Sequence, residues 1–211
     1  MLIVRYCLIP VGNKDKLYLY SQSTKVGMIV FLIGFMGSGK SFYAKGLSDY
    51  LHVPFIDLDQ FIEENQDMSI SEIFEKLGEP TFRALESVAI KQVYEDLVVR
   101  TTETQQKNDI LGVISCGGGT PCFNENMDWM NQHGFTIWIN PAEEIILERL
   151  IKEPQTRPLV SSLTEDALKE FIHQKLLERK PYYEKAQSVI NQPDITISEF
   201  VNTIQNAKNL L

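Results

Sequence analysis

The segment GFMGSGKS, at residues 34–41, constrains the fold of this chain more than any other. It matches the pattern G-x-x-x-x-G-K-[ST] in full, with a β-rich apolar run before it and a helical pattern after it. Glycines let backbone N–H groups converge on phosphate oxygens, and the positive end of the following helix points at the same anion. We therefore expect a nucleoside triphosphate here, with Lys40 reaching its β and γ phosphates and Ser41 holding Mg²⁺ through the hydroxyl.

Short apolar runs alternate with helical patterns along the rest of the chain. Strands are expected at residues 28–34, 53–59, 110–119, 134–140 and 188–191, and helices at residues 41–51, 69–77, 81–99, 141–150, 161–180 and 196–211. Capping boxes are expected where Ser69 precedes Glu72 and where Thr196 precedes Glu199. This alternation predicts an α/β fold of three layers, α/β/α, around a five-stranded parallel sheet.

Composition narrows the choice of partners. The chain has 211 residues and a net charge of −8, which argues against nucleic acid or an anionic membrane as the main partner. Its three cysteines fit no usual metal-binding spacing, so we interpret them as reduced thiols of a cytoplasmic protein. No apolar run is long enough to span a bilayer.

The first 27 residues stand apart from this pattern. The apolar run MLIVRYCLIP and the run LYLYSQ are separated by the turn-like PVGNKD, which is consistent with a hairpin. Alternatively, Met28 is the natural start and residues 1–27 come from an upstream start codon. The sequence leaves both interpretations open.

Two aspartates follow the second predicted strand, where ligands of parallel sheets bind. Asp57 and Asp59 are expected to point the same way, because residues i and i+2 of a strand share a face. One can hold a water on Mg²⁺, and the other can accept the hydrogen bond of an attacking hydroxyl. The alternative is that Asp59 caps a helix beginning in QFIEEN.

Glycines and arginines complete the candidate site. Gly117, Gly118 and Gly119 end the third predicted strand, and three glycines in a row suit a backbone that approaches a ligand closely. Arg83 and Arg179 could bind a substrate carboxylate, because an arginine fork matches the two oxygens of that group. A separate segment, IKEPQTRPLV, is interpreted as a mobile lid at about residues 150–163, whose Arg157 could swing onto the γ-phosphate.

Taken in order, these motifs resemble those of the shikimate kinase family. The matching segments are GFMGSGKS, FIDLDQFIE with IFEKLGEPTFRALE, VISCGGG, and TRPLV with LLERKPYYEKA. The resemblance spans residues 28 to about 210 and implies a P-loop kinase fold, with residues 28–211 as the kinase domain. It also implies transfer of a phosphoryl group from ATP to the 3-hydroxyl of shikimate, on the route to chorismate and the aromatic amino acids.

The resemblance also implies a role for each matching residue. Asp59 would orient the acceptor oxygen, with Lys40 and Arg157 as the other catalytic residues. The implied ATP-binding residues are Gly37, Ser38, Gly39, Lys40, Ser41, Phe42 and Arg157. The implied substrate-binding residues are Asp59, Arg83, Glu86, Gly117, Gly118, Gly119 and Arg179. The implied Mg²⁺ residues are Ser41, Asp57 and Ser115. Members of the family are usually monomeric.

The match is weakest where the adenine would bind. Arg149 and Lys152 are both candidates for an arginine that the family often has before the lid, and residues 191–195 give no clear contact. A related small-molecule kinase, such as a gluconate kinase, is one alternative, which the arginine pair and the three glycines argue against. A nucleotide-binding module without catalysis is another, and the presence of Lys40 and Asp59 argues against it.

Overall fold

The predicted parallel sheet is present. The computed structural model describes residues 5–11, 14–20, 27–104, 110–152 and 163–208. The sheet consists of β3 (Met28–Ile33), β4 (Phe55–Asp57), β5 (Ile110–Ser115), β6 (Gly134–Ile139) and β7 (Ser188–Ile190). The order across it is β4-β5-β3-β6-β7, and every neighbouring pair is parallel. The central strand, β3, is the one that leads into the phosphate-binding segment.

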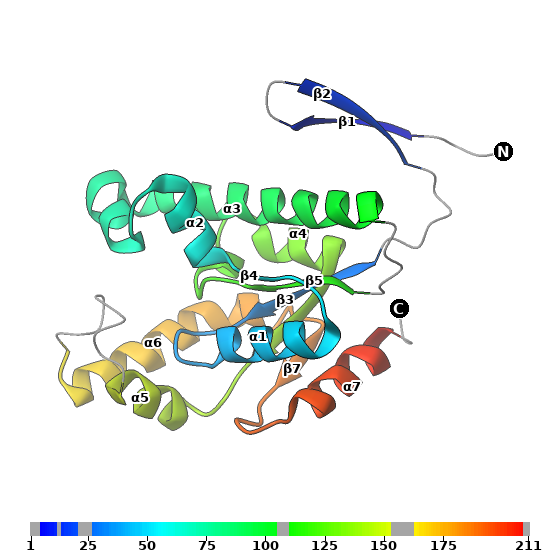
Figure 1. Cartoon of the computed structure of the whole chain (residues 1–211). Helices are drawn as coiled ribbons and strands as arrows, with labels where there is room; N and C mark the ends of the chain where they lie inside the picture. The colour runs from blue at the N-terminus through cyan, green and yellow to red at the C-terminus, as the bar shows by residue number, and fades with distance from the viewer. Residues whose placement is uncertain (1–4, 12–13, 21–26, 105–109, 153–162, 209–211) are drawn as a thin grey trace.

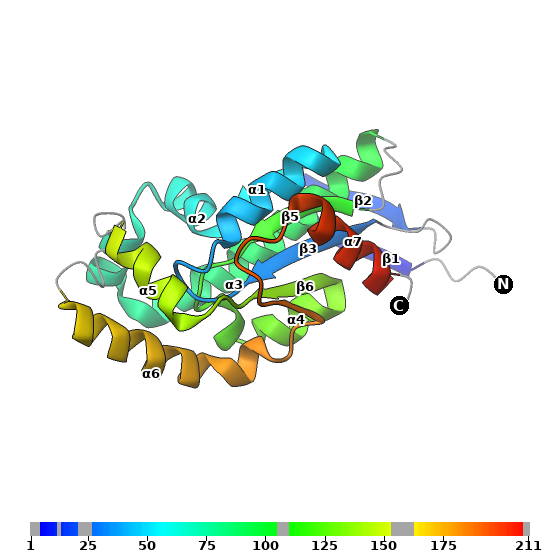
Figure 2. The same cartoon turned by 90° about the horizontal axis from the view of Figure 1, so that it is seen from below.

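Helices cover both faces of this sheet (Figures 1 and 2). They are α1 (Lys40–Leu51), α2 (Leu58–Gln66), α3 (Ile70–Thr104), α4 (Asn126–His133), α5 (Glu143–Lys152), α6 (Glu165–Tyr183) and α7 (Ile197–Lys208), with a 3-10 turn, η1, at Thr120–Cys122. Phe31 packs with α3 and α4 on one face, and Leu32 packs with α1 and α7 on the other. Apolar side chains on both faces of β3 explain why its sequence shows no polar alternation.

The two expected capping boxes are confirmed. Ser69 and Glu72 exchange backbone and side-chain hydrogen bonds before α3, and Thr196 and Glu199 do the same before α7. Thr164 caps α6. The two helices expected at residues 69–77 and 81–99 are continuous as α3 except at Gly78, whose φ of 80° is non-helical.

Three details of the sequence interpretation were wrong. Residues 53–59 are not all strand, because β4 stops at Asp57 and α2 begins at Leu58. The aspartate that caps this helix is Asp57, which accepts hydrogen bonds from the N–H groups of Asp59 and Gln60, so Asp59 is not the cap. Helix α4 was not predicted at all.

The N-terminal segment contains the strand pair that a hairpin requires. Strands β1 (Arg5–Val11) and β2 (Lys14–Tyr20) are antiparallel, with Arg5 opposite Tyr20 and Val11 opposite Lys14. Among the described residues, no helix has both the length and the apolar character of a membrane span.

Candidate active site

The loop between β3 and α1 has the backbone of a phosphate cradle. Gly34 and Gly39 have φ values of 142° and 100°, which side chains other than glycine rarely adopt. A Cβ at Gly34 would also lie 2.5 Å from the carbonyl oxygen of Ile139, so this position excludes a side chain. Lys40 is buried and donates from Nζ to the carbonyl oxygen of Phe35 at 2.8 Å, which holds the ammonium group over the loop.

Helix α5 supplies a basic side chain to the phosphate loop. Arg149 donates from Nη1 to the carbonyl oxygens of Gly37 and Ser38, at 3.2 and 2.9 Å. Of the two basic candidates before the lid, Arg149 is therefore the one at the loop, since Lys152 pairs with Glu148 on the surface. The hydroxyl of Ser38 is buried without a hydrogen-bond partner among the described residues, as expected where a bound anion would accept its hydrogen bond.

Three oxygen-bearing side chains meet beside the first turn of α1. The hydroxyl of Ser41 donates to Oδ2 of Asp57 at 2.8 Å and lies 3.1 Å from the hydroxyl of Ser115. Asp57 and Ser115 end neighbouring strands and face each other in the register of β4 and β5. Hydroxyl and carboxylate oxygens are the donors that Mg²⁺ prefers, so these residues fit a hydrated magnesium ion. Within the described residues, no group of three or more His, Cys, Asp and Glu offers another metal site.

Asp59 reaches the same region from the first turn of α2 rather than from a strand. Burial, and after it the negative charges of Asp57 and Glu86, raise the pKa of its carboxyl group to about 6, although Lys40 acts in the opposite direction. At neutral pH this group is mostly ionised, and its raised pKa makes the carboxylate a stronger base than an ordinary aspartate.

The three glycines after β5 explain how the charged side chains converge. A Cβ at Gly117 would lie 2.7 Å from Oδ1 of Asp59, and a Cβ at Gly118 would lie 3.1 Å from Nη1 of Arg179. A Cβ at Gly119 would collide with the guanidinium group of Arg83. Each glycine therefore leaves room for a different charged group, and one turn of backbone brings all three together.

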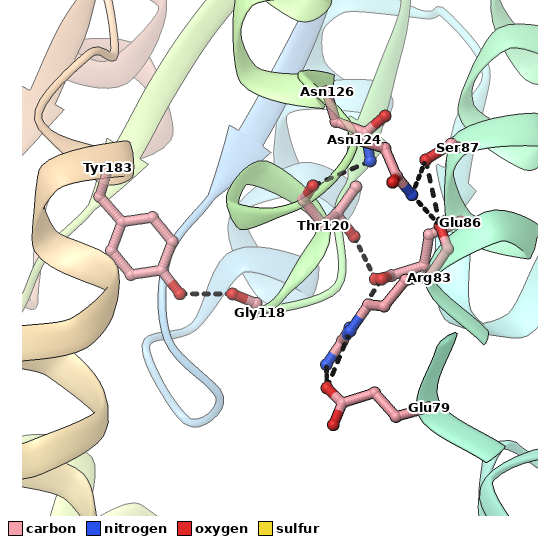
Figure 3. Close-up of polar contacts among 9 residues, drawn as sticks. All are labelled: Glu79, Arg83, Glu86, Ser87, Gly118, Thr120, Asn124, Asn126 and Tyr183. Carbon is pink, nitrogen blue, oxygen red and sulfur yellow. Dashed lines mark hydrogen bonds and ion pairs between the residues drawn. The ribbon is translucent and has the colours of Figure 1, made fainter. Parts of the chain in front are cut away.

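A buried network fixes Arg83 (Figure 3). Its Nη1 donates to Oε2 of Glu86 at 2.6 Å, and the other oxygen of Glu86 accepts from the hydroxyl of Thr120 at 2.5 Å. Glu86 and Thr120 are fully buried. Asn124 adds a bond to the carbonyl oxygen of Arg83 at 2.9 Å. Burial acts to lower the pKa of Arg83, but Glu86 and Glu79 outweigh it, and the net pKa is raised.

Arg179 comes from the other side, on α6. Its guanidinium group lies 5.4 Å from the ring centroid of Phe35, and its Nη1 is buried without a hydrogen-bond partner in the described part of the chain. One turn later on α6, the hydroxyl of Tyr183 donates to the carbonyl oxygen of Gly118 at 2.5 Å (Figure 3). A buried guanidinium nitrogen without a hydrogen-bond partner can donate to an anionic group.

The structure thus brings together most of the residues that the sequence singled out. Arg157 lies outside the described residues, as does most of the predicted lid. Phe42 is 74% exposed on α1, next to the ring of Tyr43. The hydroxyl of Tyr43 donates to the carbonyl oxygen of Pro193, which ties the weakly matching segment at residues 191–195 to α1.

Sequence reasoning missed three residues of this region, which are Glu79, Thr120 and Tyr183. It named Arg149 as a basic candidate before the lid but did not predict its contact with the loop. Glu79 and Tyr183 lay inside the quoted motifs GEPTFRALE and ERKPYYEKA, and that position was the signal that could have found them.

Comparisons with known proteins agree with this geometry. The model of the family "Shikimate kinase" matches residues 36–208. The shikimate kinase of Bacteroides thetaiotaomicron is 36% identical over 183 residues, which cover 86% of this chain and 97% of that protein. The shikimate kinase of Sulfurihydrogenibium is 37% identical over 175 residues, covering 83% and 94%.

Solved structures give the same result. The crystal structure of the Bacteroides thetaiotaomicron enzyme has a TM-score of 0.74 and 35% identity, covering 86% of this chain and 98% of that one. The shikimate kinase of Acinetobacter baumannii, solved in complex with shikimate, has a TM-score of 0.69 and 25% identity, covering 87% and 94%. Since the family model covers most of the chain and relatives above 30% identity align over nearly their whole length, the chain belongs to the shikimate kinase family.

Proposed function

We propose that this chain transfers the terminal phosphoryl group of ATP to the 3-hydroxyl of shikimate, giving shikimate 3-phosphate and ADP. The reaction belongs to the route to chorismate and the aromatic amino acids. Membership of the shikimate kinase family supports the reaction and both substrates. The single observation that carries the site is the glycine turn, because it lets Asp59, Arg179 and Arg83 converge next to the phosphate loop.

The carboxylate of shikimate binds between Arg83 and Arg179 in this proposal. Both guanidinium groups contact the same glycine turn, and Nη1 of Arg179 has an unused donor among the described residues. Charge-assisted bonds to a carboxylate are shorter and about twice as strong as neutral ones. Glu86 and Thr120 hold Arg83 in position, and the backbone of residues 117–119 lies against the hydroxylated cyclohexene ring of shikimate.

Asp59 is the acceptor-side carboxylate. It accepts the hydrogen bond of the 3-hydroxyl and takes its proton as that oxygen attacks the γ-phosphorus. The bond from the γ-phosphorus to the bridging oxygen of ADP breaks in the same displacement. A pKa of about 6 leaves Asp59 ionised at neutral pH and basic enough to take the proton.

The nucleotide phosphates lie in the cradle of Gly37, Ser38, Gly39, Lys40, Ser41 and Phe42. Their oxygens accept from the backbone N–H groups and from Lys40, while Arg149 fixes the carbonyl side of the loop. Ser41, Asp57 and Ser115 would hold Mg²⁺, whose charge would offset that of the β and γ phosphates.

Several wider assignments belong to the same proposal. Arg157 is the lid arginine at the transferred phosphate, in a lid at about residues 150–163 of a kinase domain spanning residues 28–211, and residues 1–27 are an extension to it. The enzyme acts as a monomer in the cytoplasm, without nucleic acid or membrane. The free thiols of Cys116 and Cys122 are consistent with a reducing compartment.

A coupled assay of ADP release tests the proposal with shikimate or gluconate as acceptor, with and without Mg²⁺. We expect release with shikimate and Mg²⁺, and only background release with gluconate or with EDTA. Faster release with gluconate would assign the chain to a different small-molecule kinase. ATP binding without release on either acceptor would make it a nucleotide-binding module.

A further inference from the structure

Glu79 bonds to part of the guanidinium group of Arg83, the group that should bind the substrate carboxylate. Its Oε1 accepts from Nε of Arg83 at 3.1 Å and from Nη2 at 2.8 Å, so it covers one whole edge of the guanidinium fork. Glu86 bonds to Nη1 at 2.6 Å. Figure 3 shows Glu79 meeting the guanidinium group on the side away from Thr120.

The two carboxylates are held very differently. The side chain of Glu86 is 1% exposed and is also bound by Thr120, whereas that of Glu79 is 55% exposed. A buried ion pair with a second hydrogen bond is costly to break, but an exposed pair contributes only about 0–1 kcal/mol. Of the two acidic partners of Arg83, Glu79 is therefore the one that a ligand can displace.

Little else of Arg83 is left open to an incoming anion. The rings of Phe123 and Phe82 lie over the guanidinium group, with its central carbon 4.4 and 5.1 Å from their centroids. Gly119 lies close on another side, since a Cβ built there would be 2.7 Å from that central carbon and 2.9 Å from Nη2. A carboxylate that binds in the plane of the fork, through two N–H groups, therefore needs the edge that Glu79 covers.

We propose that Glu79 is an intramolecular competitor, which holds the Nε–Nη2 edge of Arg83 until the carboxylate of the acceptor replaces it. This inference rests on the proposed function, since it assumes an acceptor that carries a carboxylate. In the empty site, Glu79 provides the acceptor for the Nε and Nη2 donors of Arg83. Its cost is a weaker affinity for the acceptor.

Calorimetric titration of shikimate into the full chain tests this inference with two variants of equal charge. Glu79→Gln removes the competing carboxylate, and Glu75→Gln, at an exposed position one turn earlier on α3, is the control. Because exposed ion pairs are worth up to about 1 kcal/mol, we expect the Kd for shikimate to fall about two- to fivefold in Glu79→Gln and to stay at the wild-type value in Glu75→Gln. An unchanged or higher Kd in Glu79→Gln would overturn the inference.

The methyl ester of shikimate supplies a second readout. The ester lacks the charged group that would compete with Glu79, so Glu79→Gln should bind it no more tightly than wild type. An equal gain for ester and acid would overturn the inference. A wild-type chain that binds ATP but not shikimate would instead overturn the proposed function, and the competitor with it. Wild-type binding of shikimate without a gain in Glu79→Gln overturns the competitor alone.

Discussion

The hydroxyl of Thr120 can be removed with almost no change of shape, by Thr120→Val. In the structure this hydroxyl donates to Oε1 of Glu86 at 2.5 Å, and both residues are fully buried. Valine leaves that carboxylate oxygen without this donor, in a side chain that is buried from solvent. The substitution therefore tests whether the buried network supports the fold.

The expected loss follows from the kind of bond that is removed. A hydrogen bond to a charged group contributes about 1.5–3 kcal/mol, and Glu86 keeps its second bond to Arg83, so we expect a free energy of unfolding lower by about 2 kcal/mol. That loss corresponds to roughly a 30-fold change in the unfolding equilibrium. For a chain of this size it also corresponds to a melting temperature lower by about 4–8 °C.

Urea denaturation of wild type, Thr120→Val and Thr81→Val measures the free energy of unfolding of each protein. Thr81 is the control, because its hydroxyl makes an exposed bond to the carbonyl oxygen of Leu77 and its loss should change stability by less than about 0.5 kcal/mol. If Thr120→Val also loses less than about 0.5 kcal/mol, the buried carboxylate does not depend on Thr120 and the reasoning fails.

Four further predictions concern the reaction. Asp59→Asn should abolish turnover while ATP still binds, and near-normal turnover would remove Asp59 from the mechanism. In wild type, kcat/KM for shikimate should fall as the pH drops below about 6, because Asp59 is then protonated and cannot accept the proton; a flat profile from pH 7 to 5 would contradict this. Arg179→Ala should raise the KM for shikimate on the order of 100-fold and that for ATP far less, whereas equal losses would argue against a carboxylate clamp. Gly119→Ala should raise the KM for shikimate roughly tenfold or more, because the new methyl group displaces Arg83, and an unchanged KM would show that Arg83 adapts.

The order of strands and helices was predictable from local patterns. Continuous apolar runs mark strands that are buried on both faces, and the capping pairs at Ser69 and Thr196 mark helix starts through bonds only three residues long. Helix α4 was not predictable from local patterns, because it has eight residues and only Met127 and Met130 as buried apolar side chains. Such a short helix depends on packing against its neighbours rather than on its own sequence.

The candidate site was predictable where its chemistry is local. The phosphate loop needs its glycines at fixed spacing, and Asp57 and Asp59 stand directly after a strand. The reasoning from strand alternation was nevertheless wrong for Asp59, since the carboxylate of Asp57 starts a helix at Leu58. Thr120 and Arg149 make contacts 34 and 111 residues away along the chain, and no local pattern records such contacts.

The bond from Tyr183 to Gly118 joins the last residue of α6 to the glycine turn. At 1.5 Å per residue, the backbone of Arg179 stands about 6 Å along the helix from Tyr183, and that of the first residue, Glu165, roughly 27 Å from it. A tilt of α6 about Tyr183 would therefore displace the backbone of Arg179 by only about a quarter as much as that of Glu165. The place of Arg179 near this bond makes its position in the site the least sensitive to such a tilt.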